Sequence, residues 1–494
     1  MPILLFGVPL YLYANLFAFP NIPFLLDGDQ VFFWVYAQRM LYGEHAYRDF
    51  FQFTPPGTDF IYLAWFRLFD PHLWVANVVV LLLGVALCGI CFSISKQVMD
   101  TGPALLATLL FLVFIYGRLL DATHHWFSML ALLCAVRIVM PGRSAPRIAM
   151  AGALFAVASF FTQTAGVAGL IALLVSIAWE GFCAKKRWRI VLGYQLLLAA
   201  AFGLVLIGLN AYFIAEIGWK QLWYFQVSYP QHYLIYKHQM FFPELPQHLT
   251  WRRWHDLVQR LFIYGLVLVI YPSTLWLCWR KCRSATFRNG QQLVLLSLLG
   301  FFLLLEIITR VNWTRLYIVS VPALILLIWA VTRSGRLARY VMATLWFIVT
   351  CLALAQTVSR HRQYSQVVRL PAGRVALSAQ NYEKFFSLMQ YTKPGDFFFQ
   401  APWPNVYLPL ELRSPVFVDV LWPDNVTRPE YVERTIQQLE CKQVKYILWS
   451  ARLEAPEDPS RPWEYHLGPL RAYLHNHYKR IRALQDQDEL WQRK

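Results

Sequence analysis

The sequence predicts an all-α polytopic membrane protein that carries a small α/β domain at its C-terminal end. Of its 494 residues, 57% are hydrophobic and only 15% are charged, whereas soluble globular chains carry nearer a quarter charged residues. Apolar runs of roughly 17–25 residues, the length that crosses a bilayer as a helix, recur as far as residue 356 and then stop. We therefore expect a membrane domain over 1–357 and a separate domain over 358–494.

Eleven apolar segments are expected to span the membrane. The first lacks a basic stretch before it and a small-residue cleavage site after it, so we expect an uncleaved span in place of a signal peptide. The eleven segments are 3–20, 73–94, 103–117, 126–142, 147–162, 164–182, 190–214, 259–279, 291–309, 315–332 and 340–357.

The charge of the connecting loops predicts the orientation in the membrane. Fifteen Lys or Arg residues lie in the loops on one side, which are 95–102, 137–147, 185–189, 280–288 and 333–339. Only three lie in the short loops on the other side, which are 117–125, 161–164 and 309–315. Because basic loops stay in the cytoplasm, we expect a cytoplasmic N-terminus and three external parts: the loops 21–72 and 216–258, and the C-terminal domain.

The formal net charge of +17 does not indicate a nucleic-acid partner. Much of the excess lies in the cytoplasmic loops, where membrane topology accounts for it. The C-terminal domain is nearly balanced, with nineteen basic and fifteen acidic residues. We expect the lipid bilayer, and no nucleic acid, as the partner of this basic surface.

The C-terminal domain shows helical and strand patterns in alternation. Residues 376–390 and 429–442 have helical spacing, and a further helix is expected over 462–478. The short apolar runs 397–400 and 444–450 read as buried strands. This alternation predicts a compact sheet with covering helices. With no phosphate loop or catalytic triad, we interpret the domain as a support or acceptor-recognition module.

The first external loop places aspartates among aromatic residues. Residues 30–42, "QVFFWVYAQRMLY", are too short to span and predict an interfacial helix whose aromatics lie at headgroup depth. Asp29 would stand at its N-cap, a position that favours aspartate for structural reasons alone. The alternative is a carboxylate held at the membrane surface to act on a lipid-borne substrate.

This loop contains Asp29, Ala37, Gly43, "YRDFF" at 47–51 and "PPG" at 55–57. Together these residues resemble the first extracytoplasmic loop of the GT-C superfamily. Within it the chain is most similar to bacterial relatives of the dolichyl-phosphate-mannose–protein mannosyltransferases and of the aminoarabinose lipid A transferase. Those proteins usually begin this helix with an acidic pair, whereas this chain has Asp29-Gln30, with Asp27 two residues earlier.

The resemblance implies an inverting glycosyltransferase. Its members move a sugar from a polyprenyl-phosphate carrier to an acceptor outside the cytoplasm, which here would be a protein, a lipid or a glycan. A single displacement needs one base for the acceptor proton and no second acid or nucleophile. Asp29 matches the catalytic aspartate of the family and is our candidate general base. The family also favours a bacterial inner membrane, with the C-terminal domain in the periplasm.

Further candidates lie in the two loops that the resemblance places near the active site. In the first loop, Asp27 is a partner carboxylate or a simple loop residue. Arg48 either pairs with Asp49 or holds the lipid phosphate with its planar fork. The second loop brings Asp121, which would complement Asp29 in catalysis, and three candidate binders of phosphate or acceptor, Arg118, His124 and His125.

A divalent metal ion is an open possibility at the two histidines. Adjacent helical residues point about 100° apart, so His124 and His125 do not easily ligate one ion together. Beyond them, Lys237 in the third loop and Arg310 and Arg315 in the last short loop are candidates for neutralising the carrier phosphate. Interfacial anchoring explains each of these cations equally simply.

Two functions of other classes compete with sugar transfer. A transporter or flippase of lipid-linked sugars would carry ionisable residues in the middle of its spans. The spans offer little of that kind, because Glu306 and Glu180 lie near span ends. A non-enzymatic scaffold would leave unexplained why polar residues concentrate in three external loops.

Overall fold

Eight helices in the described part of the chain are long and apolar enough to cross a membrane. The computed structural model describes residues 2–235, 251–281, 289–308, 311–422, 427–454 and 466–494. The eight spans and three shorter apolar helices, Ile3–Leu16, His124–Val139 and Ala145–Phe161, correspond one to one with the eleven predicted segments. The chain is therefore an integral membrane protein. The eight spans are Leu73–Ser95, Thr101–Leu119, Gln163–Cys183, Trp188–Ile217, Leu257–Lys281, Gly290–Ile307, Trp313–Val331 and Arg336–Gln363.

The chain divides into two compact units. We call the first the helical unit, which comprises Met1–Leu12, Leu81–Phe213 and His238–Gln356. We call the second the loop unit, which comprises Tyr13–Val80, Ile214–Lys237 and Thr357–Lys494. The first external loop and the C-terminal segment thus belong to one unit, together with the start of the third external loop.

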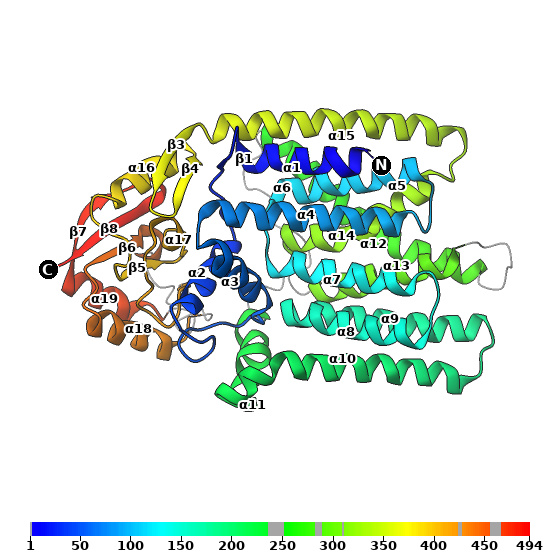
Figure 1. Cartoon of the computed structure of the whole chain (residues 1–494), viewed down its shortest axis with the longest axis horizontal. Helices are drawn as coiled ribbons and strands as arrows, with labels where there is room; N and C mark the ends of the chain where they lie inside the picture. Colours follow the sequence, from blue (N-terminus) through cyan, green and yellow to red (C-terminus); the bar gives the residue numbers. More distant parts are fainter. Residues whose placement is uncertain (1, 236–250, 282–288, 309–310, 423–426, 455–465) are drawn as a thin grey trace. The chain divides into compact units, whose positions relative to one another are not determined.

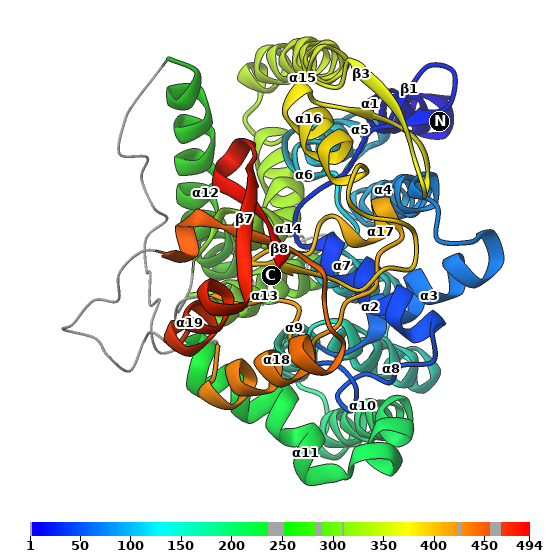
Figure 2. The same ribbon diagram turned by 90° about the vertical axis from the view of Figure 1, so that its left-hand side faces the viewer.

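The helical unit is a bundle whose helices run roughly parallel or antiparallel to one another (Figure 1). Helix α10 and helix α15 lie at its opposite edges in Figures 1 and 2, and little of their apolar surface is buried, which suits contact with lipid. The helices are α1 (Val8–Leu16), α4 (Leu73–Ser95), α5 (Thr101–Leu110), α6 (Gly117–Leu119), α7 (His124–Val139), α8 (Ala145–Phe161), α9 (Gln163–Cys183), α10 (Trp188–Ile217), α12 (Trp251–Lys281), α13 (Gly290–Ile307), α14 (Trp313–Val331) and α15 (Arg336–Gln363).

A close contact between three helices fixes the inner packing of the bundle. A Cβ atom at Gly300 of α13 would lie 2.1 Å from the ring of Tyr271, so only glycine lets this ring pass. The Tyr271 hydroxyl then donates a hydrogen bond to the Val319 carbonyl of α14, at 2.5 Å. A small residue thus allows close helix approach, and a polar side chain joins the helices where water is absent.

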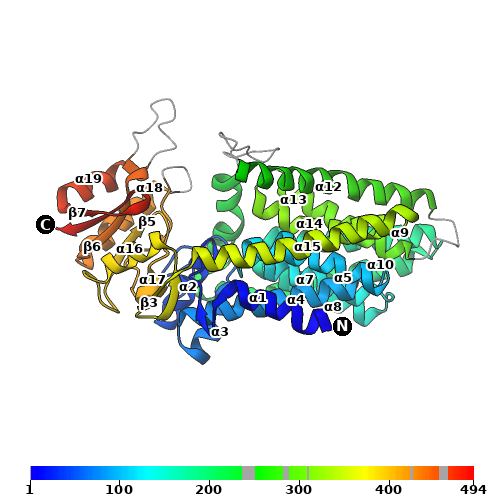
Figure 3. The ribbon, with the colours of Figure 1, turned by 90° about the horizontal axis from the view of Figure 1, so that it is seen from above.

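The loop unit contains a four-stranded mixed sheet with strand order β5-β6-β8-β7. Strands β5 (Phe398–Ala401) and β6 (Tyr446–Ser450) are parallel, whereas β8 (Asp488–Arg493) pairs antiparallel with both β6 and β7 (Tyr478–Ala483). Helix α16 lies on one side of the sheet, and α18 and α19 lie on the other (Figure 3). These helices are α16 (Ala379–Leu388), α18 (Pro429–Cys441) and α19 (Gly468–His477).

The predicted helices and strands of the C-terminal segment are found, but two strand pairs were not predicted. The helix expected over 462–478 is observed at Gly468–His477, and residues 462–465 lie outside the described residues. Helix α18 begins with Pro at its first position and buries Tyr431, Val432, Thr435 and Leu439 at helical spacing. The hairpin of β3 (Gln366–Leu370) and β4 (Gly373–Leu377) has mixed polarity, and so has the pair β7–β8. Strands with one solvated face carry too weak an apolar pattern to stand out in the sequence.

The first external loop packs onto this hairpin. Leu25 N donates to the Ala376 carbonyl at 3.0 Å, and Leu73 N donates to the Ala372 carbonyl at 3.1 Å. The loop itself holds a short pair of strands, β1 (Phe17–Ala18) and β2 (Ile22–Pro23), followed by helices α2 (Gln30–Leu41) and α3 (Gly57–Phe69). The segment after α10 forms α11 (Trp219–Trp223).

Helix α2 confirms the predicted helix but not its interfacial environment. Nine of its twelve residues, from Gln30 to Arg39, are buried, and it packs against α3 and the short helix α17 (Tyr407–Leu410). Phe33, Trp34 and Tyr36 are therefore core residues of the loop unit. A short, largely apolar helix is found in protein cores as well as at the depth of the lipid headgroups. The sequence pattern therefore did not distinguish these two environments.

Candidate functional site

Asp29 lies at the N-terminus of α2 with its side chain exposed. Asp29 occupies the N-cap position, as expected, but it has helical φ and ψ angles, −59° and −20°, and its carboxylate makes no capping hydrogen bond. Gly28, with φ of +89°, turns the chain immediately before it. Asp27 Oδ1 accepts a hydrogen bond from Gly28 N at 2.9 Å, which gives Asp27 a local role in this turn.

Arg48 and Asp49 form the ion pair that the sequence suggested as one alternative. Arg48 Nη2 lies 2.8 Å from Asp49 Oδ2, and Arg48 Nη1 also contacts Glu216 at the end of α10. Partial burial acts to raise the pKa of the Asp49 carboxyl, but hydrogen bonds from Arg48 and the His45 backbone outweigh it and lower that pKa. The Arg48 side chain is 47% exposed, so a ligand can reach it.

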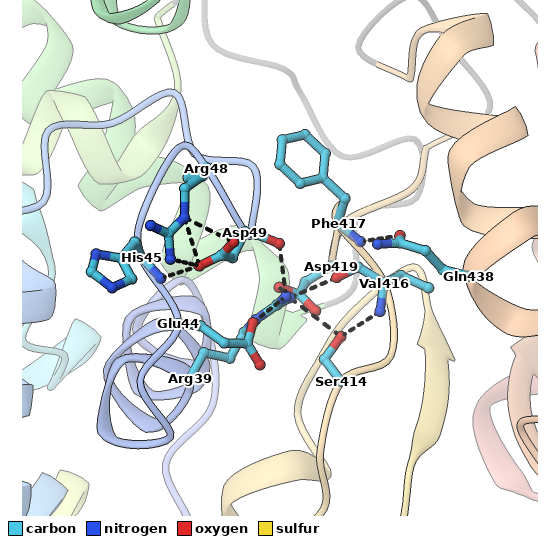
Figure 4. Close-up of polar contacts among 10 residues, drawn as sticks. All are labelled: Arg39, Glu44, His45, Arg48, Asp49, Ser414, Val416, Phe417, Asp419 and Gln438. Carbon is cyan, nitrogen blue, oxygen red and sulfur yellow. Dashed lines mark hydrogen bonds and ion pairs between the residues drawn. The ribbon is translucent and has the colours of Figure 1, made fainter. Parts of the chain in front are cut away.

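A buried arginine joins this loop to the C-terminal segment (Figure 4). Arg39 Nη1 donates to Asp419 Oδ2 at 2.9 Å and to the Val416 carbonyl at 2.7 Å. Its Nε donates to Glu44 Oε2 at 2.7 Å, and its Nη2 donates to the Asp49 carbonyl at 3.2 Å. The side chains of Arg39 and Asp419 are 5% and 0% exposed, so this ion pair is almost completely desolvated.

A second buried carboxyl in the first loop lies at Asp59, in the first turn of α3. Its residue is fully buried, and Gln52 Nε2 donates to its Oδ2 at 2.5 Å. Burial raises the pKa of the Asp59 carboxyl well above its ordinary value, although the Gln52 hydrogen bond acts in the opposite direction. Burial thus favours the protonated, neutral form of the Asp59 carboxyl, which has a structural place in the loop.

The wild-type protein is expected to lose stability as the pH rises, and Asp59→Asn is expected to abolish this loss. The folded protein keeps a proton that the unfolded chain releases near pH 3.9, so the free energy of unfolding falls between that pH and the higher folded pKa. Asparagine does not ionise and shows no such fall. As the pH is raised above 4.5, the thermal unfolding midpoints of the two solubilised proteins should move apart in favour of the variant. Parallel curves would contradict this assignment.

Basic side chains gather at one end of the helical unit, where α6 meets α7 and α13 meets α14. Arg118 donates to Gln259 Oε1, and the guanidinium of the neighbouring Arg260 lies 5.0 Å from the Trp313 ring. Asn312 caps α14 by accepting a hydrogen bond from Arg315 N at 2.8 Å, which places Arg315 in the first turn of that helix. We call Arg118, Arg260 and Arg315 the basic cluster.

The two histidines and two carboxyl groups lie in the same region as the basic cluster. The rings of His124 and His125 are only 3.9 Å apart, nearer than the expected divergence of adjacent helical residues. His125, Glu306 and Arg315 line a cavity of about 20 Å³, room for about one water molecule. Asp121 is 8% exposed in the turn that precedes α7.

Besides Arg39 and Asp59, three residues that sequence reasoning did not single out have informative contacts. Arg260 Nε is a buried donor without a hydrogen-bond partner in the described part of the chain. Glu216 is the acid that meets Arg48, and Asp419 is the acid that meets Arg39. Of the residues that were predicted, Lys237 and Arg310 lie outside the described residues. Within the described ranges, no three His, Cys, Asp or Glu side chains come together as a metal site.

No protein-family model matches the chain, and no curated protein matches it by sequence. Solved structures do match. ArnT from Cupriavidus metallidurans, determined with undecaprenyl phosphate bound, aligns with a TM-score of 0.63 at 12% identity and covers 99% of this chain and 97% of its own. The archaeal oligosaccharyltransferase AglB from Archaeoglobus fulgidus, determined with an inhibitory peptide and a dolichol-phosphate, aligns with a TM-score of 0.51 at 10% identity, over 91% of this chain and 69% of its own.

The same archaeal oligosaccharyltransferase, tethered to an acceptor peptide, aligns equally well, with a TM-score of 0.51 at 10% identity. Similarity at such low identity defines the fold and leaves the substrate open. The near-complete coverage includes both the membrane helices and the C-terminal segment. The predicted fold class is therefore confirmed, and the chain shares its fold with ArnT and with the archaeal oligosaccharyltransferase.

Proposed function

We propose that the protein is an inverting glycosyltransferase that moves a sugar from a polyprenyl-phosphate carrier to an acceptor outside the cytoplasm. The observation that carries the proposal is the basic cluster in a chain of GT-C fold. Its Arg260 Nε is buried without a hydrogen-bond partner in the described residues, and burying such a donor is costly unless an acceptor meets it. A carrier phosphate supplies such an acceptor. ArnT, which shares the fold, binds undecaprenyl phosphate.

Asp29 takes the acceptor proton in this proposal. Its side chain is exposed, so a substrate hydroxyl or amine can reach it. As the proton passes to the carboxylate, the acceptor atom attacks the anomeric carbon from the face opposite the phosphate, and the bond from that carbon to the phosphate oxygen breaks. Polyprenyl phosphate leaves as an anion and needs no acid to protonate it. Asp121 is a second candidate for orienting the acceptor.

The orientation of the protein follows from the same loops. The basic connections lie on the side opposite the basic cluster, and positive residues favour the cytoplasm. We infer that the external loops and the C-terminal segment lie in the periplasm of a bacterial inner membrane.

Arg315→Ala is expected to raise the KM for the donor by roughly tenfold, with a smaller effect on kcat. A charge-assisted hydrogen bond to phosphate contributes about 1.5–3 kcal/mol, and 1.4 kcal/mol corresponds to tenfold. The measurement is initial transfer rates against donor concentration in proteoliposomes. Arg336→Ala, at the other end of the bundle, is the matched control and should leave the donor KM unchanged. An unaltered KM in Arg315→Ala would exclude Arg315 from donor binding.

The test of the function itself is sugar transfer in membranes that contain the protein. Labelled undecaprenyl-phosphate sugars are supplied with cell-envelope acceptors, and label is followed from the organic-soluble donor into product. The proposal predicts label in a product whose anomeric configuration is the inverse of that of the donor. Label that stays in intact donor with every sugar offered would contradict the proposal.

A further inference from the structure

The loop that contains Arg48 is held by contacts from two other segments of the loop unit. On one side, Phe51 N donates to the Phe417 carbonyl at 2.7 Å, so backbone joins backbone. On the other side, Gln226 Nε2 donates to the Tyr47 hydroxyl at 3.0 Å, and Glu216 pairs with Arg48. The loop therefore takes its position from the C-terminal segment and from the segment after α10.

Arg39 makes the principal polar connection between the loop and the C-terminal segment. Its guanidinium bonds to Asp419 and the Val416 carbonyl on one side, and to Glu44 and the Asp49 carbonyl on the other (Figure 4). It also lies 5.0 Å from the centre of the Phe50 ring. A planar group with five donors suits this set of partners, whereas the single ammonium of lysine does not.

The segment that Arg39 meets is itself fixed to the α/β domain. Phe417 N donates to Gln438 Oε1 of α18 at 2.7 Å, and Phe398 N of β5 donates to the Arg413 carbonyl at 3.1 Å. The Arg434 guanidinium of α18 lies 3.6 Å from the centre of the Phe417 ring. The position of residues 413–419 is thus set by the sheet and by α18.

These contacts form one continuous connection from the domain to an exposed cation. Arg39 donates hydrogen bonds to the Asp419 carboxylate and to the Asp49 carbonyl. The Asp49 carboxylate in turn forms an ion pair with Arg48 at 2.8 Å. Every member except Arg48 and Asp49 is buried or nearly so, and buried groups with several bonds have few alternative positions. A displacement of residue 49 would therefore change where the Arg48 guanidinium points.

We propose that Arg39 is a positioning residue through which the C-terminal α/β domain sets the geometry of Arg48 for the carrier phosphate. This inference rests on the proposed function, and it assigns the domain to donor binding in place of acceptor recognition. Glu216 then acts as the counter-ion of Arg48 in the free protein, and the donor phosphate takes its place.

The test compares donor and acceptor parameters in full-length Arg39→Lys and Asp419→Asn. Both variants preserve much of the shape of the site but remove part of the connection. We expect the donor KM to rise about tenfold in each, with the acceptor KM within twofold of wild type. Arg480→Lys alters an exposed ion pair with Glu489 in the same domain, at 2.7 Å, and should change neither parameter.

The outcomes separate the possible roles. A raised acceptor KM with an unchanged donor KM would assign the domain to acceptor recognition and overturn the inference. A lowered melting temperature with both parameters unchanged in the folded fraction would reduce Arg39 to a stabilising role and also overturn it.

Binding of undecaprenyl phosphate, followed by native mass spectrometry, separates this inference from the proposed function. Weakened binding in Arg39→Lys, with equal binding by wild type and Arg480→Lys, supports the inference even if no sugar is transferred. Equal binding by all three proteins contradicts it.

Discussion

Asp29→Asn is expected to lower kcat for sugar transfer by on the order of 100-fold or more, because a positioned general base typically contributes 10²–10⁴-fold. Asparagine has nearly the same shape but does not accept the acceptor proton. The helix should be unaffected, because the Asp29 carboxylate makes no capping hydrogen bond to α2. The donor KM should change little, because the loss lies in the chemical step. The measurement is kcat in proteoliposomes at matched protein content.

Asp70→Asn is the matched control for this prediction. Asp70 is another exposed carboxylate of the first loop, at the end of α3. Asparagine has the same branching at its side chain as aspartate, so the substitution adds no new backbone strain at the Asp70 φ of +60° and ψ of 163°. The control should keep the rate of the wild type. If Asp29→Asn keeps it too, the base must be sought at Asp121 or Asp49.

Arg39→Met is expected to destabilise the loop unit by about 3–5 kcal/mol, the usual cost of removing one partner of a buried ion pair. The variant leaves Asp419, whose side chain is 0% exposed, without its cation. Asp419 Oδ1 already lacks a hydrogen-bond partner in the described part of the chain, so little else compensates the charge. The measurement is the free energy of unfolding from denaturant titration in detergent.

A second substitution distinguishes charge from packing in this prediction. Arg39→Met combined with Asp419→Leu removes both charges and should recover much of the lost stability, because apolar residues often replace a buried pair without cost. Arg480→Met breaks a pair whose arginine side chain is 60% exposed and should have little effect. Equal losses in Arg39→Met and Arg480→Met would contradict the importance of burial.

The membrane helices were predictable because their signal is local. A span needs a continuous apolar run, so each of the eleven segments could be found without knowing its neighbours. The helix over 30–42 was predictable for the same reason, but its environment was not. Whether Trp34 and Tyr36 face lipid headgroups or a protein core depends on α3 and α17, which no local pattern reveals.

The site was predictable only where contacts are close in sequence. Arg48 and Asp49 are neighbours, and their pairing was one of two stated alternatives. Arg39 and Asp419 are 380 positions apart, and Arg48 and Glu216 are 168 apart. Asp419 does carry a sequence signal, as a lone acid in the apolar run "VFVDVLW". Such a residue is rarely buried without a partner, but its partner requires the fold.

The measurement that tests the central claim most directly is the fate of the bond between sugar and phosphate. Purified protein in proteoliposomes is given doubly labelled undecaprenyl-phosphate sugar and envelope acceptors, and both labels are followed. Sugar transfer predicts one free undecaprenyl phosphate for each sugar that appears in product. Donor that crosses the bilayer with its bond intact, while no product forms, would contradict transfer and identify a transporter of lipid-linked sugars.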